Sequence, residues 1–164
     1  MATKDMTQAS AQKPTRDQVL GLDIATHCGF YSTHDSGTWN FEESMRRNNN
    51  KQHKAFRDTL IDFITKYDIR QIVAEDVNVN NHFIDQRKLS EFRGILLEVC
   101  DTLDLPEPAF INVKVVKSWA TGDGNADKAT MIKFAKLRWK VECIDDNEAD
   151  ALHIWQYYIH KFHI

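Results

Sequence analysis

Short apolar runs open the chain and predict strands. The run V-L-G-L-D-I-A within residues 18–25 is apolar apart from one aspartate, which predicts a buried strand. Residues 28–34 and 37–42 predict two more strands, and the turn-forming sequence H-D-S-G at 34–37 joins them. Three consecutive strands at the beginning of the chain favour an antiparallel meander.

The middle of the chain combines two helices with one further strand. A polar stretch at 45–52 leads into a helix whose apolar residues recur at the helical period: Phe56, Leu60, Phe63, Ile64 and Tyr67. Residues 70–76 predict a strand, and 78–81 predict a loop. A long helix follows, with the apolar stripe Leu89, Phe92, Leu96, Val99 and Leu103. Each stripe should face the sheet.

The last third of the chain predicts one strand and three helices. Residues 109–113 predict a short strand, and a short helix beginning at 115–120 is stopped by T-G-D-G-N at 121–125. Two more helices are predicted from about 127 to 139 and from about 146 to 161. One mixed five-stranded sheet flanked by helices is an α/β layer fold.

Composition indicates an ordinary globular domain. With 164 residues, 42% of them hydrophobic, we expect residues 18–164 to fold together behind a flexible polar tail, residues 1–17. No apolar stretch approaches the roughly 20 residues of a membrane span, and the N-terminus lacks the apolar core of a signal peptide. Three scattered cysteines without a C-x-x-C pair indicate a reducing compartment. We therefore expect a cytoplasmic protein that is not secreted and does not associate with a membrane.

The distribution of charge changes this picture. A net charge of −3 is unusual for a nucleic-acid binder. However, one segment collects basic residues against only Asp123 and Asp127. These are Lys114, Lys117, Lys128, Lys133, Lys136, Arg138 and Lys140. The segment predicts either a nucleic-acid contact surface or a solvated helix face.

Acidic residues end two of the predicted strands and begin the last helix. Asp23 and Glu75 each close a short apolar run, which places them at the edge of a sheet. The sequence D-D-N-E-A-D-A-L at 145–152 adds Asp146 and Asp150 on one helical face. Carboxylates gathered in this way repel one another unless a cation joins them, and hard oxygen ligands suit Mg²⁺ or Mn²⁺. Two such ions are the usual means of hydrolysing a phosphodiester.

Purely structural roles compete with this interpretation. Asp145 and Glu148 have the spacing of a capping box, and the helix dipole favours acidic residues in the first turn. A salt bridge could compensate Asp23. The G-x-G-x-A-x-K sequence at Gly122, Gly124 and Lys128 suits a backbone that approaches phosphate, but it also suits an ordinary turn and helix cap.

Four segments in order over residues 19–160 resemble the motifs of the RuvC-type Holliday-junction resolvases, endonucleases of the ribonuclease-H-like superfamily. They are G-L-D-I-A-T-H-C-G-F, I-V-A-E-D-V, G-D-G-N-A-D-K-A-T-M and N-E-A-D-A-L. The resemblance implies a ribonuclease-H-like fold and two Mg²⁺ ions, for which Mn²⁺ can substitute, held by Asp23, Glu75 and Asp150. The fourth ligand of the family falls on Asn147, where Asp or His is usual, and we favour the adjacent Asp146.

The resemblance also implies contacts to DNA. Lys128 should contact phosphate near the scissile bond, with Gly122, Gly124, Lys117 and Lys133 as further DNA-binding candidates. The family's base-stacking aromatic falls on Asn78, and Phe83 could replace it or instead open the core stripe of its helix. His153, one turn after Asp150, is expected at the surface.

These features predict a Mg²⁺-dependent, structure-specific endonuclease that resolves four-way junctions by paired cleavage. Two cuts imply a homodimer. The resemblance implies that the interface is the helix after Glu75, where Phe83, Ile95 or Leu97 would add a second apolar stripe. The alternatives are a flap, fork or RNA–DNA hybrid nuclease of the same superfamily, and a junction-binding module without catalysis.

Overall fold

Five strands form one mixed sheet in the computed structural model, which describes residues 12–42, 49–76 and 83–164, without the side chains of 49 and 83–86. The strands are β1 (Val19–Asp23), β2 (His27–Tyr31), β3 (Ser36–Asn40), β4 (Gln71–Glu75) and β5 (Ala109–Ile111). Their order is β3-β2-β1-β4-β5; the β1–β2 and β2–β3 pairs are antiparallel, and β1–β4 and β4–β5 are parallel. The predicted antiparallel meander and mixed five-stranded sheet are confirmed.

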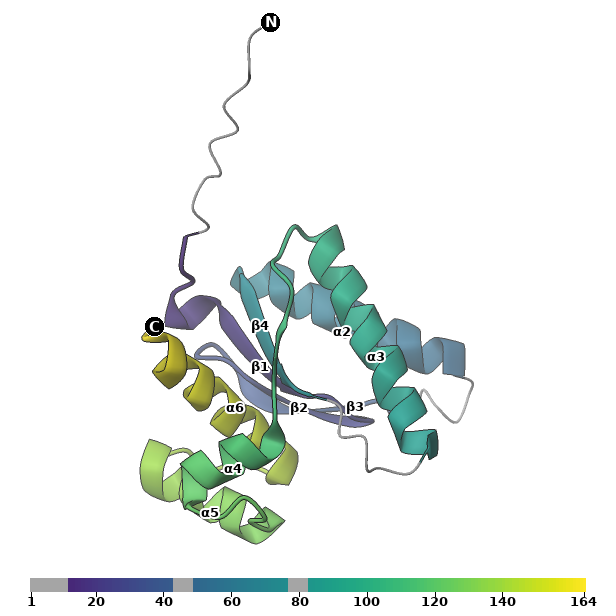
Figure 1. The fold of residues 1–164 in the computed structure, drawn as a ribbon. Coiled ribbons are helices and arrows are strands. Elements are labelled where there is room, and N and C mark those ends of the chain that lie inside the picture. The colour runs from purple at the N-terminus through teal and green to yellow at the C-terminus, as the bar shows by residue number, and fades with distance from the viewer. Residues whose placement is uncertain (1–11, 43–48, 77–82) are drawn as a thin grey trace, which may run out of the picture.

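Helices cover both faces of this sheet (Figure 1). One face carries α2 (Asn49–Tyr67) and α3 (Phe83–Thr102). The other carries α6 (Asp146–Phe162) directly on the sheet, with α4 (Val113–Thr121) and α5 (Lys128–Trp139) packed against α6. A short 3-10 helix, η1 (Arg16–Gln18), precedes β1. None of the helices in the described ranges is long and apolar enough to span a membrane.

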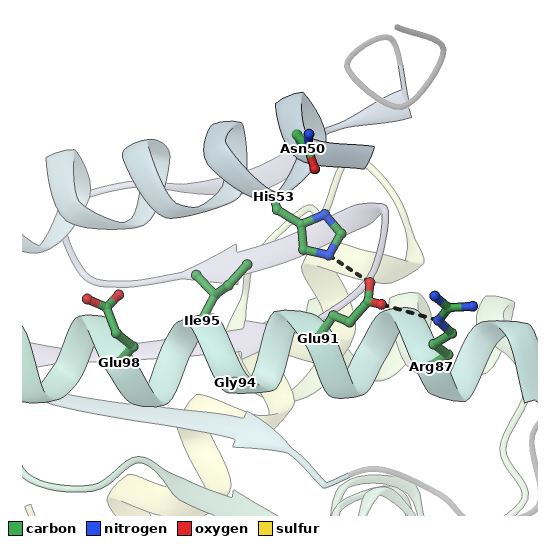
Figure 2. Close-up of a pocket in the computed structure, with 7 residues that line it drawn as sticks. All are labelled: Asn50, His53, Arg87, Glu91, Gly94, Ile95 and Glu98. Carbon is green, nitrogen blue, oxygen red and sulfur yellow. Dashed lines mark hydrogen bonds and ion pairs between the residues drawn. The ribbon is translucent and has the colours of Figure 1, made fainter. Parts of the chain in front are cut away.

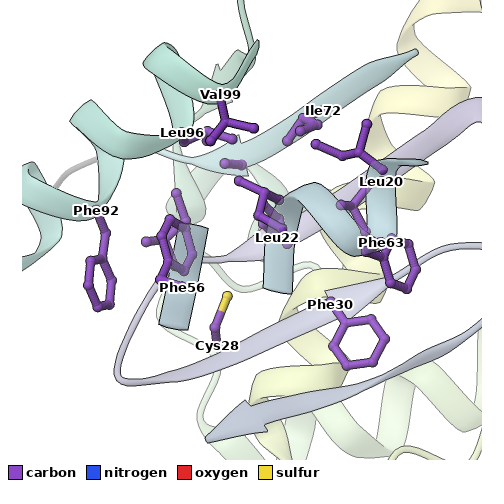
Figure 3. Packing of buried hydrophobic residues seen from close by; sticks show 14 of the residues in the cluster. Leu20, Leu22, Cys28, Phe30, Phe56, Phe63, Ile72, Phe92, Leu96 and Val99 are labelled. Atoms are coloured by element: carbon purple, nitrogen blue, oxygen red, sulfur yellow. The ribbon is translucent and has the colours of Figure 1, made fainter. Parts of the chain in front are cut away.

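The period-two alternation of the strands divides the core between the two faces. Leu20, Leu22 and Ile72 point toward α2 and α3, where they meet Phe56 and Phe92 (Figure 3). The intervening residues point toward α6. Val19 and Val73 are buried there with Val116, Ile154 and Trp155. Residues of opposite parity on β1 and β4 therefore belong to different cores.

Two glycines bring α6 unusually close to the sheet. A Cβ at Gly21 would lie 2.7 Å from the carbonyl oxygen of Ala151, and a Cβ at Gly29 would lie 1.9 Å from that of Asn147. Any side chain at either position would push the helix outward. The absence of side chains at these two positions of β1 and β2 thus sets the height of α6 above the sheet.

Local hydrogen bonds shift several predicted boundaries. The turn after β2 begins earlier than 34–37, because the Ser32 hydroxyl donates to Asp35 O and the Ser32 amide bonds the same oxygen, which shortens β2 and starts β3 at Ser36. The strand predicted at 109–113 ends at Ile111. The Asn112 side chain accepts a hydrogen bond from the Lys114 amide and starts α4 two residues before the predicted position.

The predicted tail, residues 1–17, stays a prediction as a unit, because residues 1–11 lie outside the described ranges. Its last residues do contact the domain. The Thr33 hydroxyl donates to Asp17 over 2.6 Å, and Arg16 Nε donates to Ile164 O over 2.9 Å. Contacts with the body of the fold therefore begin before residue 18.

Candidate metal centre and nucleic-acid interface

Asp23 and Glu75 end two adjacent parallel strands. Leu22 pairs with Ala74 in the β1–β4 register, so the next residues, Asp23 and Glu75, lie side by side. They share the parity of Gly21 and Val73 and therefore face α6. The two carboxyl groups are close enough for each to shift the pKa of the other. The sheet edge thus supplies two acids on one face.

The first turn of α6 lies directly above this edge. Gly29 pairs with Asp23 across the β1–β2 ladder, and the Asn147 carbonyl sits over Gly29. Asp150 follows Asn147 by one helical turn and returns to the same side. Asp145 caps the helix by accepting a hydrogen bond from the Glu148 amide over 2.9 Å, as its spacing predicted.

The pKa values show that the acids act on one another. Burial raises the pKa of Asp23 well above its usual range, and the charges of Glu75 and Asp150 raise it further. Burial and Glu75 raise the pKa of Asp150 to about 7, against the lowering effects of Lys117 and Lys128. The pKa of Glu75 is also raised by burial, although the hydrogen bond with Asp23 and the charge of Lys117 oppose the shift. A nearby cation would relieve all three carboxylates.

The chemistry of this cluster fits a hard divalent cation. The Oδ1 atom of Asp150 is buried and accepts no hydrogen bond in the described structure, which leaves a desolvated oxygen uncompensated. Within the described ranges, however, no three His, Cys, Asp or Glu side chains are already arranged around a common point as an ion would need. Binding an ion here therefore requires the side chains to draw closer together.

Asp146 and Asn147, the two candidates for the fourth ligand, lie differently. The Asp146 carboxylate is 3.5 Å from Lys128 Nζ, and its charge raises the pKa of both Asp23 and Asp150. Asn147 is partly buried, with its backbone carbonyl turned onto β2. Asp146 thus belongs electrostatically to the acid cluster.

Two of the predicted basic residues reach the acids. Lys128 is the first residue of α5, its side chain is 84% exposed, and it pairs with Asp146. Lys117, on α4, lowers the pKa of Glu75 and of Asp150. Lys133 is on α5, and no described contact joins it to the acid cluster. The structure therefore brings together Lys117 and Lys128 but leaves Lys133 apart.

The glycine loop before Lys128 has a structural role at one position. Gly122 ends α4 in the left-handed region, with φ of 85°, where a glycine is favoured over other residues. A Cβ at Gly124 would lie 3.4 Å from Lys114 O, an ordinary van der Waals contact. A phosphate contact at either glycine stays a prediction. The stacking candidates do too, because Asn78 and the Phe83 side chain lie outside the described residues.

The expectation of a surface histidine at position 153 is wrong. His153 is fully buried, and its Nδ1 accepts a hydrogen bond from Trp139 Nε1 over 3.2 Å. Its Nε2 lies 2.9 Å from Met131 O. Burial lowers the pKa of this imidazole. The residue joins α6 to α5, because α6 is enclosed by the sheet on one side and by α4 and α5 on the other.

Sequence reasoning missed two hydroxyls on β3. The Thr38 hydroxyl lies 2.7 and 2.9 Å from the two carboxylate oxygens of Asp145, and the Ser36 hydroxyl donates to Glu148 over 2.7 Å. The available signal in the sequence was that Ser36 and Thr38, two residues apart, place two hydroxyls on one face of the strand. Without the sheet order, however, nothing connected that strand to a helix more than 100 residues later.

The fold and the position of its acids define a ribonuclease-H-like domain. Among solved structures, Thermus thermophilus RuvC in complex with a Holliday junction substrate aligns with a TM-score of 0.70 at 15% identity, over 87% of this chain and 93% of that one. A second Thermus thermophilus RuvC structure gives a TM-score of 0.63 at 14% identity, over 88% and 96%. The yeast mitochondrial Holliday junction resolvase Ydc2 gives 0.57 at 14% identity, over 93% and 84%.

Sequence comparison identifies the family. No family model matches the chain. The crossover junction endodeoxyribonuclease RuvC of Brachyspira hyodysenteriae (strain ATCC 49526 / WA1) is 30% identical over 146 residues, which cover 82% of this chain and 89% of the relative. The chain belongs to the RuvC family of crossover junction endodeoxyribonucleases.

Proposed function

We propose that this protein is a divalent-metal-dependent endonuclease that resolves four-way DNA junctions. The observation that carries the proposal is the convergence of Asp23, Glu75 and Asp150 from two strands and a helix into one cluster. Burial raises the pKa of all three carboxyl groups, and neighbouring carboxylates raise those of Asp23 and Asp150 further. Membership of the RuvC family supports the substrate class, since a relative with this fold is bound to a Holliday junction.

The cluster would hold two Mg²⁺ ions, or Mn²⁺ in their place, through Asp23, Glu75 and Asp150. Such ions, when bound, supply an activated water and stabilise charge on the leaving oxygen, which leaves 5′-phosphate and 3′-hydroxyl ends. Lys117 and Lys128 stand beside the acids with positive charges, where they would bind the phosphodiester and orient it over the cluster.

Cleavage specificity separates this function from its alternatives. Purified protein with Mg²⁺ should cut a mobile four-way junction in two strands, and should cut a flap and an RNA–DNA hybrid much more slowly. Preferred cutting of the flap or hybrid would favour the alternative nuclease of the same superfamily. Tight junction binding without cleavage in Mg²⁺ or Mn²⁺ would favour a binding module.

The fourth ligand is tested by comparing Asp146→Ala with Asn147→Ala. We propose Asp146, because its charge reaches both Asp23 and Asp150. Asp146→Ala should then require more Mg²⁺ for half-maximal cleavage than Asn147→Ala. The reverse order would assign Asn147, and wild-type behaviour of both variants would mean that three carboxylates suffice.

Lys128 is tested through the salt dependence of binding. Removing one phosphate contact lowers the slope of log affinity against log salt by about 0.9. Lys128→Ala should show this change, and Lys133→Ala tests separately whether the second candidate on the same helix also contacts phosphate. An unchanged slope and cleavage rate in Lys128→Ala would return this residue to the solvated helix face.

Paired cleavage would require two copies of the chain, and we propose a homodimer through α3. On this helix Leu97 is 37% exposed and Ile95 packs partly against the core. Ile95 lines an open groove between α2 and α3, where His53 and Arg87 both bind Glu91 (Figure 2). Light scattering at micromolar concentration should give a dimer. A strict monomer, also when bound to a junction, would refute the interface.

A further inference from the structure

The first turn of α6 is tied to the edge strand β3 by two hydroxyl–carboxylate hydrogen bonds. Thr38 and Ser36 lie on the face of β3 that is turned toward α6, since they pair with Gly29 and Tyr31 of β2. Thr38 Oγ1 is 2.7 Å from Asp145 Oδ1, and Ser36 Oγ is 2.7 Å from Glu148 Oε1. Both bonds are partly buried and link residues more than 100 positions apart.

Each of these carboxylates also holds the helix terminus. Asp145 accepts from the Glu148 amide over 2.9 Å, and Glu148 accepts from the Ile144 amide over 2.6 Å. Glu148 is only 3% exposed, so its two hydrogen bonds satisfy a carboxylate that water barely reaches. The turn is thus closed on itself and fastened to β3 through the same two side chains.

The fastened turn is the one that carries the candidate ligands. Asp146 and Asn147 lie between Asp145 and Glu148, and Asp150 follows two residues later. A helix cap requires bonds only within its own turn. The additional bonds to β3 fix the first turn of α6, which carries Asp146, relative to the sheet edge that carries Asp23. The Gly29 contact limits the height of the same turn above the sheet.

We propose that Thr38 and Ser36 are positioning residues for the metal centre. They hold Asp145 and Glu148, and through them set the orientation of Asp146 and Asp150 toward the acids of β1 and β4. The proposal rests on the proposed function. The remainder of α6 is held independently by its buried residues between Ala149 and Ile159, so losing the hydroxyls should loosen the acid cluster before it unfolds the protein.

The test compares Thr38→Val with Thr38→Ser. Valine keeps the shape of threonine and removes the hydroxyl, whereas serine restores it. Thr33→Val is the matched control, because the Thr33 hydroxyl also bonds a carboxylate, that of Asp17, away from the acid cluster. Ser36→Ala provides a second, smaller disruption in case Thr38→Val folds poorly. Calorimetric titration with Mn²⁺, without DNA, measures binding directly, and junction cleavage is followed over a range of Mg²⁺ concentrations.

Thr38→Val should weaken Mn²⁺ binding by about 10- to 100-fold, as is typical when support around metal ligands is removed. Its half-saturating Mg²⁺ concentration should rise in parallel, and saturating Mg²⁺ should recover most of the rate. Thr38→Ser should match the wild type, and Ser36→Ala should move in the same direction as Thr38→Val.

The proposal is overturned if folded Thr38→Val and Ser36→Ala bind Mn²⁺ as tightly as Thr33→Val does. In that case a wild-type protein that still cuts junctions would leave the proposed function intact. A wild-type protein that neither binds Mn²⁺ nor cleaves any branched DNA would instead remove the proposed function together with this inference.

Discussion

The two faces of the sheet are built from the same strands and serve different ends. On the α2–α3 face, Leu20, Leu22 and Ile72 pack into a continuous core around Phe56 and Phe92, all of them buried (Figure 3). On the α6 face, the neighbouring positions are Gly21, Asp23, Val73 and Glu75. Side-chain volume fills the first face, and the second combines a close backbone approach with desolvated charge. A shift of one residue along a strand therefore moves a side chain from the packed core on the α2–α3 face to the candidate metal centre on the α6 face.

The largest expected difference between the faces is in cleavage. Asp23→Asn should reduce junction cleavage roughly a thousandfold or more, since metal ligation contributes several kcal/mol and each 1.4 kcal/mol is about tenfold in rate. Junction affinity should persist, because the basic residues are unchanged. Asp150→Asn should behave alike. Single-turnover cleavage and binding measured on the same preparations check this, and substantial Mg²⁺-dependent cutting by either variant would contradict the site.

The opposite face should show the reverse behaviour. Leu96→Ala removes a fully buried side chain of α3 and should destabilise the protein by about 2–5 kcal/mol. The molecules that remain folded should cleave normally, because Leu96 lies on the face away from the acids. Urea denaturation gives the stability change, and cleavage at low temperature gives the rate per folded molecule. A loss of cleavage rate as large as that of Asp23→Asn would contradict the separation of roles between the two faces.

On the α6 face, adding a single methyl group should reduce both stability and cleavage. Gly29→Ala would place a Cβ 1.9 Å from Asn147 O, so the start of α6 must move. We expect a stability loss of about 1–3 kcal/mol from overpacking and a severe loss of cleavage. Gly94→Ala on α3 is the control, because nothing lies within 4 Å of its Cβ, and it should stabilise the helix by about 0.5–1 kcal/mol. Thermal melts distinguish the two, and an undisturbed Gly29→Ala enzyme would mean that α6 tolerates displacement.

The smallest expected effect is a dependence of stability on pH. Asp150 has its folded pKa raised to about 7, so the metal-free folded state binds a proton more readily than the unfolded chain. The bound proton stabilises the folded state. Its contribution is fully present below about pH 4 and is lost as the pH rises through about 7, and the free energy of unfolding falls by at most roughly 1.4 kcal/mol per pH unit for one group. Denaturation in EDTA between pH 5 and 8 should show a steeper fall for the wild type than for Asp150→Asn. Parallel curves would place Asp150 outside the coupled cluster.

Much of the fold was predictable because the chain is locally consistent. Apolar runs, helical stripes and turn residues each indicated their element, and the elements agree with the structure to within a few residues. The boundaries that differ, at β2 and α4, depend on single side chains that hydrogen bond the backbone, Ser32 and Asn112. Such bonds compete with strand pairing and leave little trace in a hydrophobic pattern.

The sequence alone singled out the candidate site residues, since acids at the ends of apolar strands are costly to bury without a cation or a basic partner. Only the tertiary structure decided how they meet. The contact of Gly29 with Asn147, the enclosure of His153 and the hydroxyls of Ser36 and Thr38 all join elements distant along the chain. Local patterns record the parity and period of each element, whereas the spacing between elements depends on backbone approach and on buried hydrogen bonds, which exist only once the sheet and α6 have packed together.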